Sequence, residues 1–532
     1  MAPSRRLPDM KGGRQKAAKV VTDFTTPASA HATLKTREDA TGEAERQESQ
    51  GARYQHGSKS LRHYQAAIVC LKLVDQLGPN QFETIYNIAR LSLLLATDFL
   101  AAPHCLEGVA DAIDWYRKAL GLLGTGEGRE GEAIDGGLNL AQALAVLAGM
   151  IEDGAQYIGS DQRMSKRFGG KGMGYLFEAR ELFRTGEALQ TREMEKSGFG
   201  GSGMTEETEG ELMAVEGNLE VEATQSNIVV PALVLATVLD SIANDLVIFR
   251  LSTPPSTDTA ALIIASLSRA LQLRNLIPAD QAAANPTQDL DLELSTLTIS
   301  AALNSACISH PFYQTSDLII NAYVSLIKSH PKNPELPSEY ADYLIDSLSS
   351  SLPTSLAGTM NEIQQSYRLS HSLLADPFRP RGSIPVIAIP SMIAFNLVSQ
   401  AYSLLLAHHL SPSANLRSQC TTLLSNAIES AGAGMKLVRS SSGSYALEMK
   451  SADGRRDWQT IKALREALLL LIRLFIRDES IMQEARSIVE VLGKLVGRDG
   501  RDEVGRCLEE IRDDALWEVC GNEQAMWEKL LA

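Results

Sequence analysis

Two glycine-rich stretches match a pattern that binds nucleotide phosphates in many proteins. Residues 126–131 (GEGREG) and 198–203 (GFGGSG) both fit G-x-G-x-x-G. A dinucleotide site also needs a buried strand before the glycines and a helix after them, whose N-terminal amides face the phosphates. Neither stretch follows a strand-like segment, and both lie beside glutamates that would repel a pyrophosphate. We therefore interpret both as loops and expect no cofactor.

The histidines, cysteines and serines form no pattern typical of a metal site or a hydrolase. His408 and His409 are adjacent, so on a helix their side chains would point about 100° apart and would not easily share one metal ion. His104 and Cys105 have no second pair of ligands at a fixed spacing, and neither G-x-S-x-G nor H-E-x-x-H occurs. We predict that the chain has no metal site and is not an enzyme.

The chain is predicted to be helical, so helices would position any functional residue. Hydrophobic residues make up 44% of the 532 residues and aromatic residues only 5%, which excludes wholesale disorder and disfavours a β-rich core. Apolar residues recur at helical spacing, as at Leu61, Ile68 and Leu71. Residues 440–456 are polar and dotted with glycine, so we interpret them as a loop. The prediction is an all-α stack of helical hairpins.

The charge balance and the thiols indicate the class of partner and the compartment. The chain has 50 Lys and Arg against 65 Asp and Glu, a net charge of −15, which disfavours nucleic-acid binding because phosphate contacts need a basic surface. Six cysteines are scattered without a C-x-x-C pair, as in a reducing compartment. No segment is expected to cross a membrane, since the best candidate, 227–249, carries Asp240 and Asp245. We expect a cytoplasmic or nuclear protein.

Composition divides the chain into four parts. Residues 1–55 are polar with basic residues near the start, and we expect a disordered arm that is a soluble tail or a targeting signal. Residues 56–192 carry the clearest repeats, and residues 227–532 hold a C-terminal helical array. Between them, residues 193–226 are predicted to be a flexible acidic linker. Its glutamates are Glu206, Glu207, Glu209, Glu211, Glu216, Glu220 and Glu222.

Similar helix patterns recur in the first half of the chain. They lie at residues 64–80 (YQAAIVCLKLVDQLGPN), 85–91 (IYNIARL), 112–120 (AIDWYRKAL), 139–144 (NLAQAL) and 179–183 (ARELF). These segments resemble tetratricopeptide (TPR) repeats, most closely over residues 64–123. The resemblance implies α-α hairpins stacked into a TPR-like solenoid with loop insertions, and such arrays are known as protein-binding scaffolds. The C-terminal half is either a degenerate continuation or another α-α stack.

Small residues recur where paired helices would cross. Ala89, Ala112, Ala141 and Ala179 are predicted at these crossings, because only small side chains let two helix backbones approach closely. The wider spacing from Ala141 to Ala179 indicates an insertion, which costs little because the entropy of loop closure grows slowly with length. Near the C-terminus, Trp517 and Trp527 are predicted to anchor a capping helix.

The TPR resemblance also implies a groove for a partner, because the first helix of each pair lines the concave face of such arrays. The residues expected in this groove are Glu83, Tyr86, Asn87, Arg90, Leu138, Asn139 and Gln142. A clamp for the acidic C-terminal tails of Hsp70 and Hsp90 would also need lysine and arginine from the next first helix. This chain has Asp135 and Asn139 there, so we predict no binding of such tails.

Three functions fit the sequence. The first is a non-enzymatic scaffold, adaptor or dedicated chaperone for another polypeptide, and the acidic charge favours a basic partner. The second is an enzyme on an α/α stack, with Asp342 and Asp346, which lie on one predicted helix face, as paired carboxylates. The third is a structural subunit whose two halves bind different neighbours in a larger complex.

Overall fold

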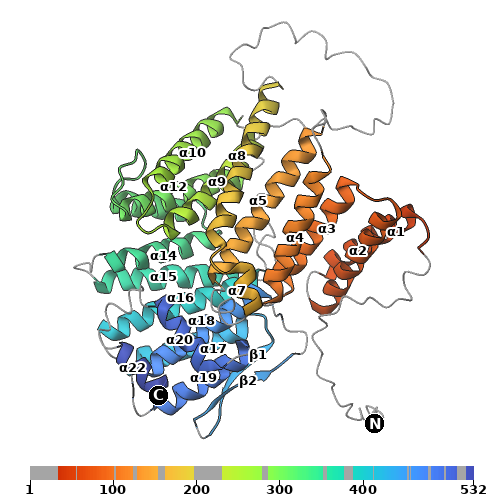
Figure 1. The fold of residues 1–532 in the computed structure, drawn as a ribbon. Helices are drawn as coiled ribbons and strands as arrows, with labels where there is room; N and C mark the ends of the chain where they lie inside the picture. The colour runs from red at the N-terminus through yellow and green to blue at the C-terminus, as the bar shows by residue number, and fades with distance from the viewer. Residues whose placement is uncertain are drawn as a thin grey trace, which may run out of the picture.

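A computed structural model shows a chain that is helical over most of its length (Figure 1). The described residues are 34–54, 57–100, 103–123, 129–153, 162–196, 231–277, 286–350, 356–376, 388–410 and 413–531, the last range with gaps at 442, 452–454, 456, 477, 479–480, 497–498 and 512–522. Within these ranges the fold is all-α apart from one two-stranded sheet. The acidic linker glutamates and the second glycine-rich stretch lie outside the described residues.

Successive helices of the first half pack as hairpins. The pairs are α1 (Arg37–Tyr54) with α2 (Gly57–Leu77), α3 (Phe82–Asp98) with α4 (His104–Gly121), and α5 (Glu130–Asp153) with α8 (Gly172–Lys196). The short helix α7 (Gln162–Phe168) lies in the connection between α5 and α8, where an insertion was predicted. Each hairpin packs on the next, α2 on α3, α4 on α5 and α8 on α9. The chain is therefore a solenoid of helical hairpins.

The second half continues the stack. Its helices are α9 (Pro231–Leu251), α10 (Thr257–Leu276), α12 (Pro286–Ser305), α13 (Ser316–Ser329), α14 (Glu335–Ser350), α15 (Leu356–Leu374), α16 (Ile389–Leu410), α17 (Ala414–Ser430), α18 (Trp458–Phe475), α19 (Met482–Val496), α20 (Gly500–Ile511) and α22 (Glu523–Leu531). The closest pairs are α9 with α10, α14 with α15, and α16 with α17. In α22, the predicted cap residue Trp527 is buried, whereas Trp517 lies outside the described residues.

Small residues set the distance between the paired helices. Ala89, Ala112, Ala141 and Ala179 are all fully buried, as predicted. Helices α3 and α4 lie close together at Gly108, where an added Cβ would lie only 2.9 Å from the Cβ of Ala96. Because van der Waals contact between carbons begins near 3.5 Å, no residue larger than glycine fits there without moving one helix.

Helix α1 contradicts the prediction of a disordered arm as far as residue 55. It packs on α2 through small residues: Ala44 and Gly51 are buried, and an added Cβ on Gly51 would lie 2.9 Å from the ring of Tyr64. The Ser60 hydroxyl donates a hydrogen bond of 2.8 Å to the Gly51 carbonyl. A helix that packs through alanine and glycine lacks the large apolar side chains that reveal helical periodicity. The disorder prediction is therefore wrong for the residues of α1.

A short β-hairpin lies partly within the segment that was predicted to be a loop. Strand β1 (Met435–Arg439) pairs antiparallel with β2 (Tyr445–Met449), and Leu437 faces Leu447 across the pair. Leu437 is buried in the C-terminal apolar cluster, and β1 and β2 contact α17 and α19. Packing against these helices supports a hairpin that would be marginal alone. The loop prediction for residues 440–456 is wrong for β2.

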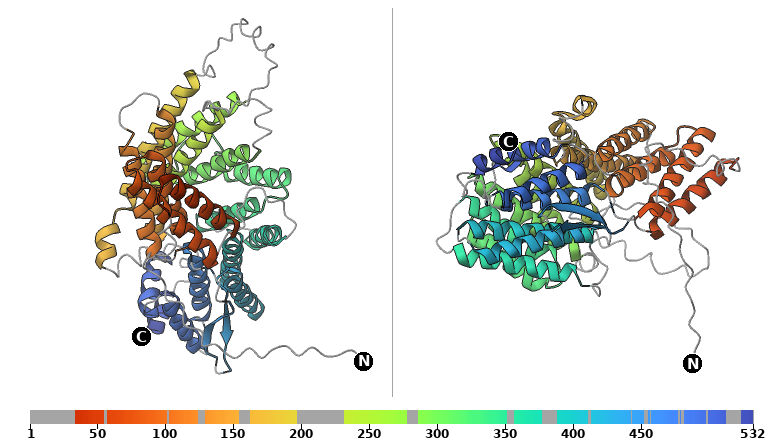
Figure 2. Two further views of the ribbon diagram at one scale, coloured as in Figure 1. Left: turned by 90° about the vertical axis from the view of Figure 1, so that its right-hand side faces the viewer. Right: turned by 90° about the horizontal axis from the view of Figure 1, so that it is seen from below.

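The solenoid curves until its C-terminal helices meet its N-terminal hairpins (Figure 1, Figure 2). Trp458, the first residue of α18, is 5% exposed and belongs to the same apolar cluster as Ala89, Val109 and Phe183 of α3, α4 and α8. Asp98 at the end of α3 interacts electrostatically with Arg455, just before α18. A nearest-neighbour stack needs no such contact, so Trp458 joins two distant parts of the chain into one body.

Buried ion pairs hold the last helices in place. The Arg473 Nη2 atom of α18 lies 2.7 Å from the Glu523 Oε2 atom of α22, and the Arg465 Nε atom lies 2.8 Å from the Glu503 Oε1 atom of α20. All four side chains are less than one-tenth exposed. Each pair is hydrogen-bonded, as a charge removed from water requires.

Three helical segments are long and apolar enough to cross a membrane by length and composition, which contradicts the expectation that none qualifies. They are Glu130–Glu152, Pro231–Leu251 and Ile389–His408. In the fold, 56%, 56% and 61% of these windows are buried inside the protein. In the second, the Asp245 carboxylate accepts a hydrogen bond of 2.5 Å from Arg180 of α8. Packing against neighbouring helices therefore accounts for much of this apolar surface.

Candidate functional site

The predicted groove residues lie on two first helices that contact each other. Glu83, Tyr86, Asn87 and Arg90 are on α3, and Leu138, Asn139 and Gln142 are on α5. The Asn139 Nδ2 atom joins the two helices by donating a hydrogen bond of 2.9 Å to the Tyr86 hydroxyl. Seven residues chosen from the sequence thus belong to one continuous part of the molecule.

Leu138 also packs inside the hairpin. Its Cδ2 atom would lie 2.6 Å from a Cβ added to Gly186, so this side chain fills the space left by a glycine of α8. Leu138 and Tyr86 both pack on the apolar cluster of the N-terminal hairpins. Leu138 therefore contributes to the packing of α5 on α8. The sequence did not indicate this contact, because a leucine can lie either in a groove or between two helices.

Two acidic residues extend this face to neighbouring helices, and the sequence analysis did not include them. The Arg90 Nη2 atom donates a hydrogen bond of 2.7 Å to Glu48 of α1. The Gln142 Nε2 atom donates one of 3.0 Å to Asp240 of α9. The first helices α1, α3, α5 and α9 are thereby linked by polar side chains, and we call this surface the first-helix face. Glu48 lay in the part predicted to be disordered.

The first-helix face carries several carboxylates. Asp135 and Asp240 are open to solvent, yet burial raises the pKa of both carboxyls. Partial loss of hydration makes the charged form of a carboxyl group less favourable, which is the physical cause of both shifts. Glu83 of α3 is a further exposed carboxylate.

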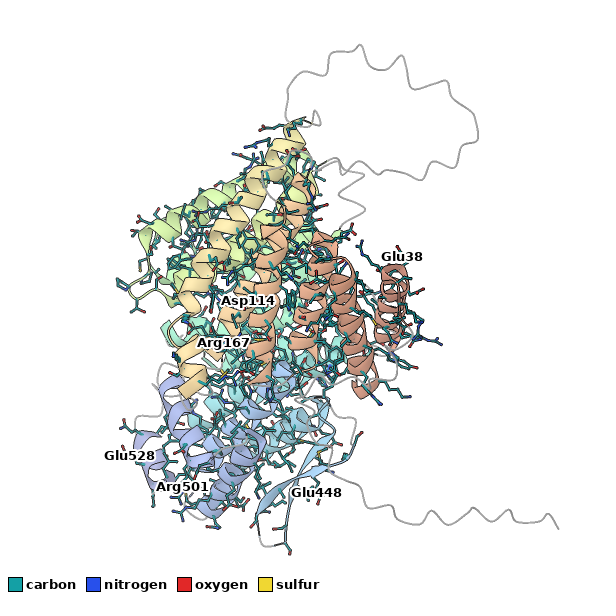
Figure 3. The ribbon with its side chains drawn as sticks, turned by 45° about the vertical axis from the view of Figure 1, so that its right-hand side comes forward. Glu38, Asp114, Arg167, Glu448, Arg501 and Glu528 are labelled. Carbon is teal, nitrogen blue, oxygen red and sulfur yellow. The ribbon has the colours of Figure 1, made fainter. Side chains whose placement is uncertain are left out.

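The outer surface of the hairpins carries charges that pair with one another. The Arg167 Nη2 atom of α7 lies 3.0 Å from Asp111 of α4, and the Arg117 Nη2 atom lies 2.8 Å from Glu178 of α8. Figure 3 shows Asp114 on α4 and Arg167 on α7. Helices α4, α7 and α8 therefore carry paired charges of both signs on this surface.

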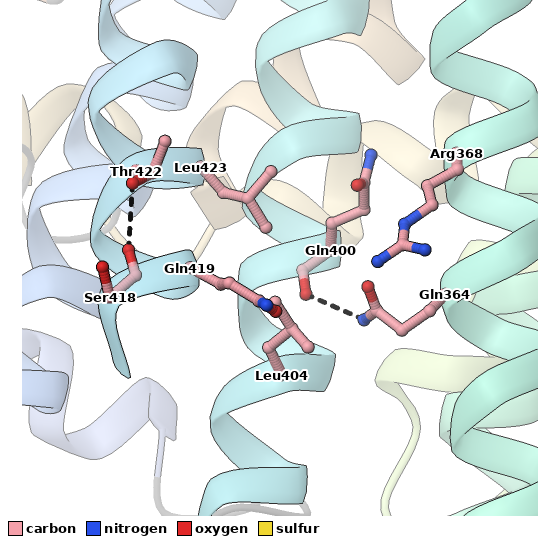
Figure 4. Close-up of a pocket in the computed structure, with 8 residues that line it drawn as sticks. All are labelled: Gln364, Arg368, Gln400, Leu404, Ser418, Gln419, Thr422 and Leu423. Carbon is pink, nitrogen blue, oxygen red and sulfur yellow. Dashed lines mark hydrogen bonds between the residues drawn. The ribbon is translucent and has the colours of Figure 1, made fainter. Parts of the chain in front are cut away.

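A cavity lies among α15, α16 and α17 (Figure 4). Its volume is about 230 Å³, and Arg368, Gln400 and Gln419 are among its lining residues. The Gln364 Nε2 atom donates to the main-chain carbonyl of Gln400 at 3.1 Å, while its buried Oε1 atom has no hydrogen-bond partner. This combination suits small polar groups, and it holds no nucleophile paired with a base.

A second cavity tests the proposed carboxylate pair of α14. Its volume is about 300 Å³, and Asp342 lines it whereas Asp346 does not. Burial raises the pKa of Asp342 to about 6, although the Tyr367 hydroxyl donates a hydrogen bond to its carboxylate. The structure therefore places one of the two predicted carboxylates in a cavity and leaves the other outside it.

The described residues show no group of three histidine, cysteine, aspartate or glutamate side chains that could hold a metal ion. Cys70, Cys105 and Cys420 are buried, and burial raises the pKa of the Cys70 thiol to about 11. These thiols are protonated at neutral pH and act as small apolar side chains.

Comparison with known proteins gives no family for the chain. No family model and no curated protein matches the sequence. Among solved structures it is similar to a circular tandem repeat protein with novel repeat topology and enhanced subunit contact surfaces, at 11% identity and a TM-score of 0.23, over 89% of this chain and 91% of that one. A superposition this loose carries no functional information. The assignment as a helical-hairpin solenoid rests on the packing of its own helices.

Proposed function

We propose that this protein is a non-enzymatic scaffold or dedicated chaperone that holds a basic segment of another polypeptide on its first-helix face. The observation that carries the proposal is the presence there of three exposed carboxylates, Glu83 on α3, Asp135 on α5 and Asp240 on α9. Burial raises the pKa of Asp135 and Asp240, and a cationic side chain beside them would favour their charged forms. We place this activity in the cytoplasm or the nucleus.

We also infer that the hairpins α1/α2, α3/α4 and α5/α8 are divergent TPR units. The support is the buried alanines at the helix contacts and the alternation of first and second helices. The sequence pattern of the first unit covered only its second helix, α2. Helix α1, which the sequence analysis did not predict, is the first helix of that unit. Binding of Hsp70- or Hsp90-type tails is not expected, because the face offers carboxylates where a clamp needs cations.

Site-specific crosslinking tests the proposal directly. A photoreactive amino acid replaces Glu83 on the first-helix face or, as a control, Asp114 on the outer surface; both positions are exposed. We expect partner polypeptides to crosslink at position 83 and not at 114, with yields that fall several-fold between about 50 and about 500 mM salt because ions screen the attraction. Equal yields at the two positions would contradict the proposal.

The second candidate function is an enzyme that uses Asp342. Its support is one observation, a carboxyl group in a cavity with its pKa raised to about 6, close to the value that suits a general acid or base. The variant Asp342→Asn distinguishes the two functions: it would abolish an activity based on this carboxyl, whereas crosslinking from position 83 would continue.

A further inference from the structure

The cavity lined by α12, α14, α15 and α16 has an acidic wall. Glu335, Glu339 and Asp342 line it from α14. Their spacing of four and three residues places all three on one side of that helix. Glu339 and Asp342 remain exposed to solvent, while burial raises the pKa of both carboxyls. They are therefore reachable from outside and incompletely hydrated.

Two buried polar groups line the same cavity without a hydrogen-bond partner. Ser370 of α15 is 1% exposed and Asn396 of α16 is 3% exposed. The Ser370 Oγ atom and the Asn396 Nδ2 atom have no partner, although Asn396 Oδ1 accepts a hydrogen bond of 2.7 Å from Gln400. Buried polar groups in folded proteins nearly always have a partner. These two side chains therefore bring unsatisfied polar atoms to the wall of the cavity.

The remaining wall is apolar. Leu374, Met392 and Phe395 line it, and Met392 and Phe395 are half-buried. An aliphatic chain that carries a cation at its end suits this combination, because the chain covers the apolar wall while the cation reaches the carboxylates. Phe395 adds an aromatic ring, on which a guanidinium group stacks well.

The electrostatic surroundings leave room for another cation. Arg250 at the end of α9 interacts with Glu339 and lowers its pKa, against the larger effects of burial and of neighbouring acids. Besides burial, the negative charge of Asp346 raises the pKa of Asp342, and the hydrogen bond that Asp342 accepts from the uncharged Tyr367 hydroxyl lowers it. Among the described residues, no three histidine, cysteine, aspartate or glutamate side chains lie close enough together to hold a metal ion. An organic cation therefore fits this wall better than a metal ion.

We propose that this cavity is a specificity pocket for a single arginine side chain of the partner polypeptide. The guanidinium donates hydrogen bonds to Glu339 and Asp342, and Ser370 Oγ accepts another. Asn396 Nδ2 donates to a main-chain carbonyl of the bound segment. The volume of about 300 Å³ is at the low end for ligand pockets, which suits one side chain. The inference deepens the proposed function and rests on it.

Peptide binding to the full-length protein tests the pocket. The probe is Ac-Gly-Ser-Gly-Arg-Gly-Ser-Gly-amide, observed by saturation-transfer NMR, and its control contains citrulline, which has nearly the same shape without the charge. We expect millimolar binding of the arginine peptide and at least tenfold weaker binding of the citrulline peptide. The double variant Glu339→Gln/Asp342→Asn should weaken arginine binding at least tenfold, while the matched variant Glu38→Gln/Asp39→Asn on the exposed side of α1 changes it less than twofold. Circular dichroism shows that both variants are folded.

Each other outcome overturns a defined part of the proposal. Equal weakening by the two double variants would mean that only the net charge attracts the peptide. Binding of spermidine, but not of the peptide, with the same dependence on Glu339 and Asp342 would assign the cavity to small polyamines. If crosslinking from position 83 succeeds and the peptide does not bind, the scaffold function stands and the pocket is wrong. If the peptide binds and no polypeptide crosslinks, the cavity binds arginine but is not a specificity pocket of the proposed scaffold, and the first-helix face is wrong.

Discussion

The N-terminal hairpins and the C-terminal helices are held together by different means. In the α3/α4 and α5/α8 hairpins, glycine and alanine let the backbones approach, as at Gly108 against Ala96 and Gly186 against Leu138. In the C-terminal part, α18 is joined to α20 and α22 by arginine–glutamate pairs that are less than one-tenth exposed. A buried pair, Arg180 with Asp245, also joins α8 to α9, so the difference applies to the contacts within the α3/α4 and α5/α8 hairpins. Those contacts depend on side-chain size, whereas the contacts of α18 with α20 and α22 depend on charge, so the two sets should respond to different substitutions.

The largest expected effect is the loss of a buried ion pair. Arg473→Met leaves Glu523 as a buried charge without its arginine and should lower the free energy of unfolding by about 3–5 kcal/mol. Denaturant unfolding followed by circular dichroism measures this loss. The double variant Arg473→Met/Glu523→Leu should recover most of it. Arg486→Met, at an exposed position of α19, is the control and should change stability by less than about 0.5 kcal/mol. If Arg473→Met changed the free energy of unfolding no more than the control does, the idea that ion pairs hold the C-terminal helices together would be wrong.

A smaller effect is expected from filling a close contact of the N-terminal region. Gly108→Ala would place a Cβ 2.9 Å from the Cβ of Ala96, so α3 and α4 must separate, at a cost of about 1–3 kcal/mol. Gly149→Ala is the matched control, because a Cβ there meets nothing within 4 Å. It should stabilise the protein by up to about 1 kcal/mol through better helix propensity. Thermal unfolding of the two variants in parallel would show opposite shifts.

Helix capping differs between α3 and α18. Asp457 caps α18 by accepting a hydrogen bond of 3.0 Å from the Thr460 amide, whereas Gln81 at the start of α3 makes no such bond. The backbone at Gln81 already has the extended conformation of an N-cap, with φ −103° and ψ 127°. Gln81→Asp should therefore stabilise the protein by about 0.5–1 kcal/mol, and Gln81→Ala should leave its unfolding midpoint nearly unchanged.

The smallest expected effect is a pH dependence from Asp342. Its pKa is raised to about 6 in the folded protein and is about 3.9 in an unfolded chain, so the folded state binds the proton more tightly. Stability contributed by this group therefore falls as pH rises from about 4 to about 6 and is constant above that. Asp342→Asn should flatten this part of the profile, by less than about 1 kcal/mol because solvent screens the group. Urea titrations at several pH values measure it.

The sequence predicted the features that depend on local spacing. Ala89 and Ala141 recur in register with large apolar residues, so the hairpins and their buried alanines were predictable. Helix α1 was missed because Ala44 and Gly51 carry no periodic signal. The polar links of Arg90 to Glu48 and of Gln142 to Asp240 join residues far apart in the chain, and nothing in the local sequence indicates such partners.

The same limit applies to the second half. Asp342 was noted for its position on a helix face, but its cavity is built with Ser370 and Asn396 from two later helices. Neither residue has a sequence pattern that distinguishes it from an ordinary helical serine or asparagine. Contacts of this kind depend on how the stack curves, which no single segment determines.

Trp458 has a consequence for synthesis on the ribosome. It packs in one cluster with Phe183, and at about 5–20 residues per second the ribosome needs roughly 14–55 s to translate the chain between them. During that interval the emerging hairpins leave uncovered the apolar patch that the indole later occupies. A nascent chain halted before residue 458 should therefore be captured by general holding factors more readily than the finished polypeptide.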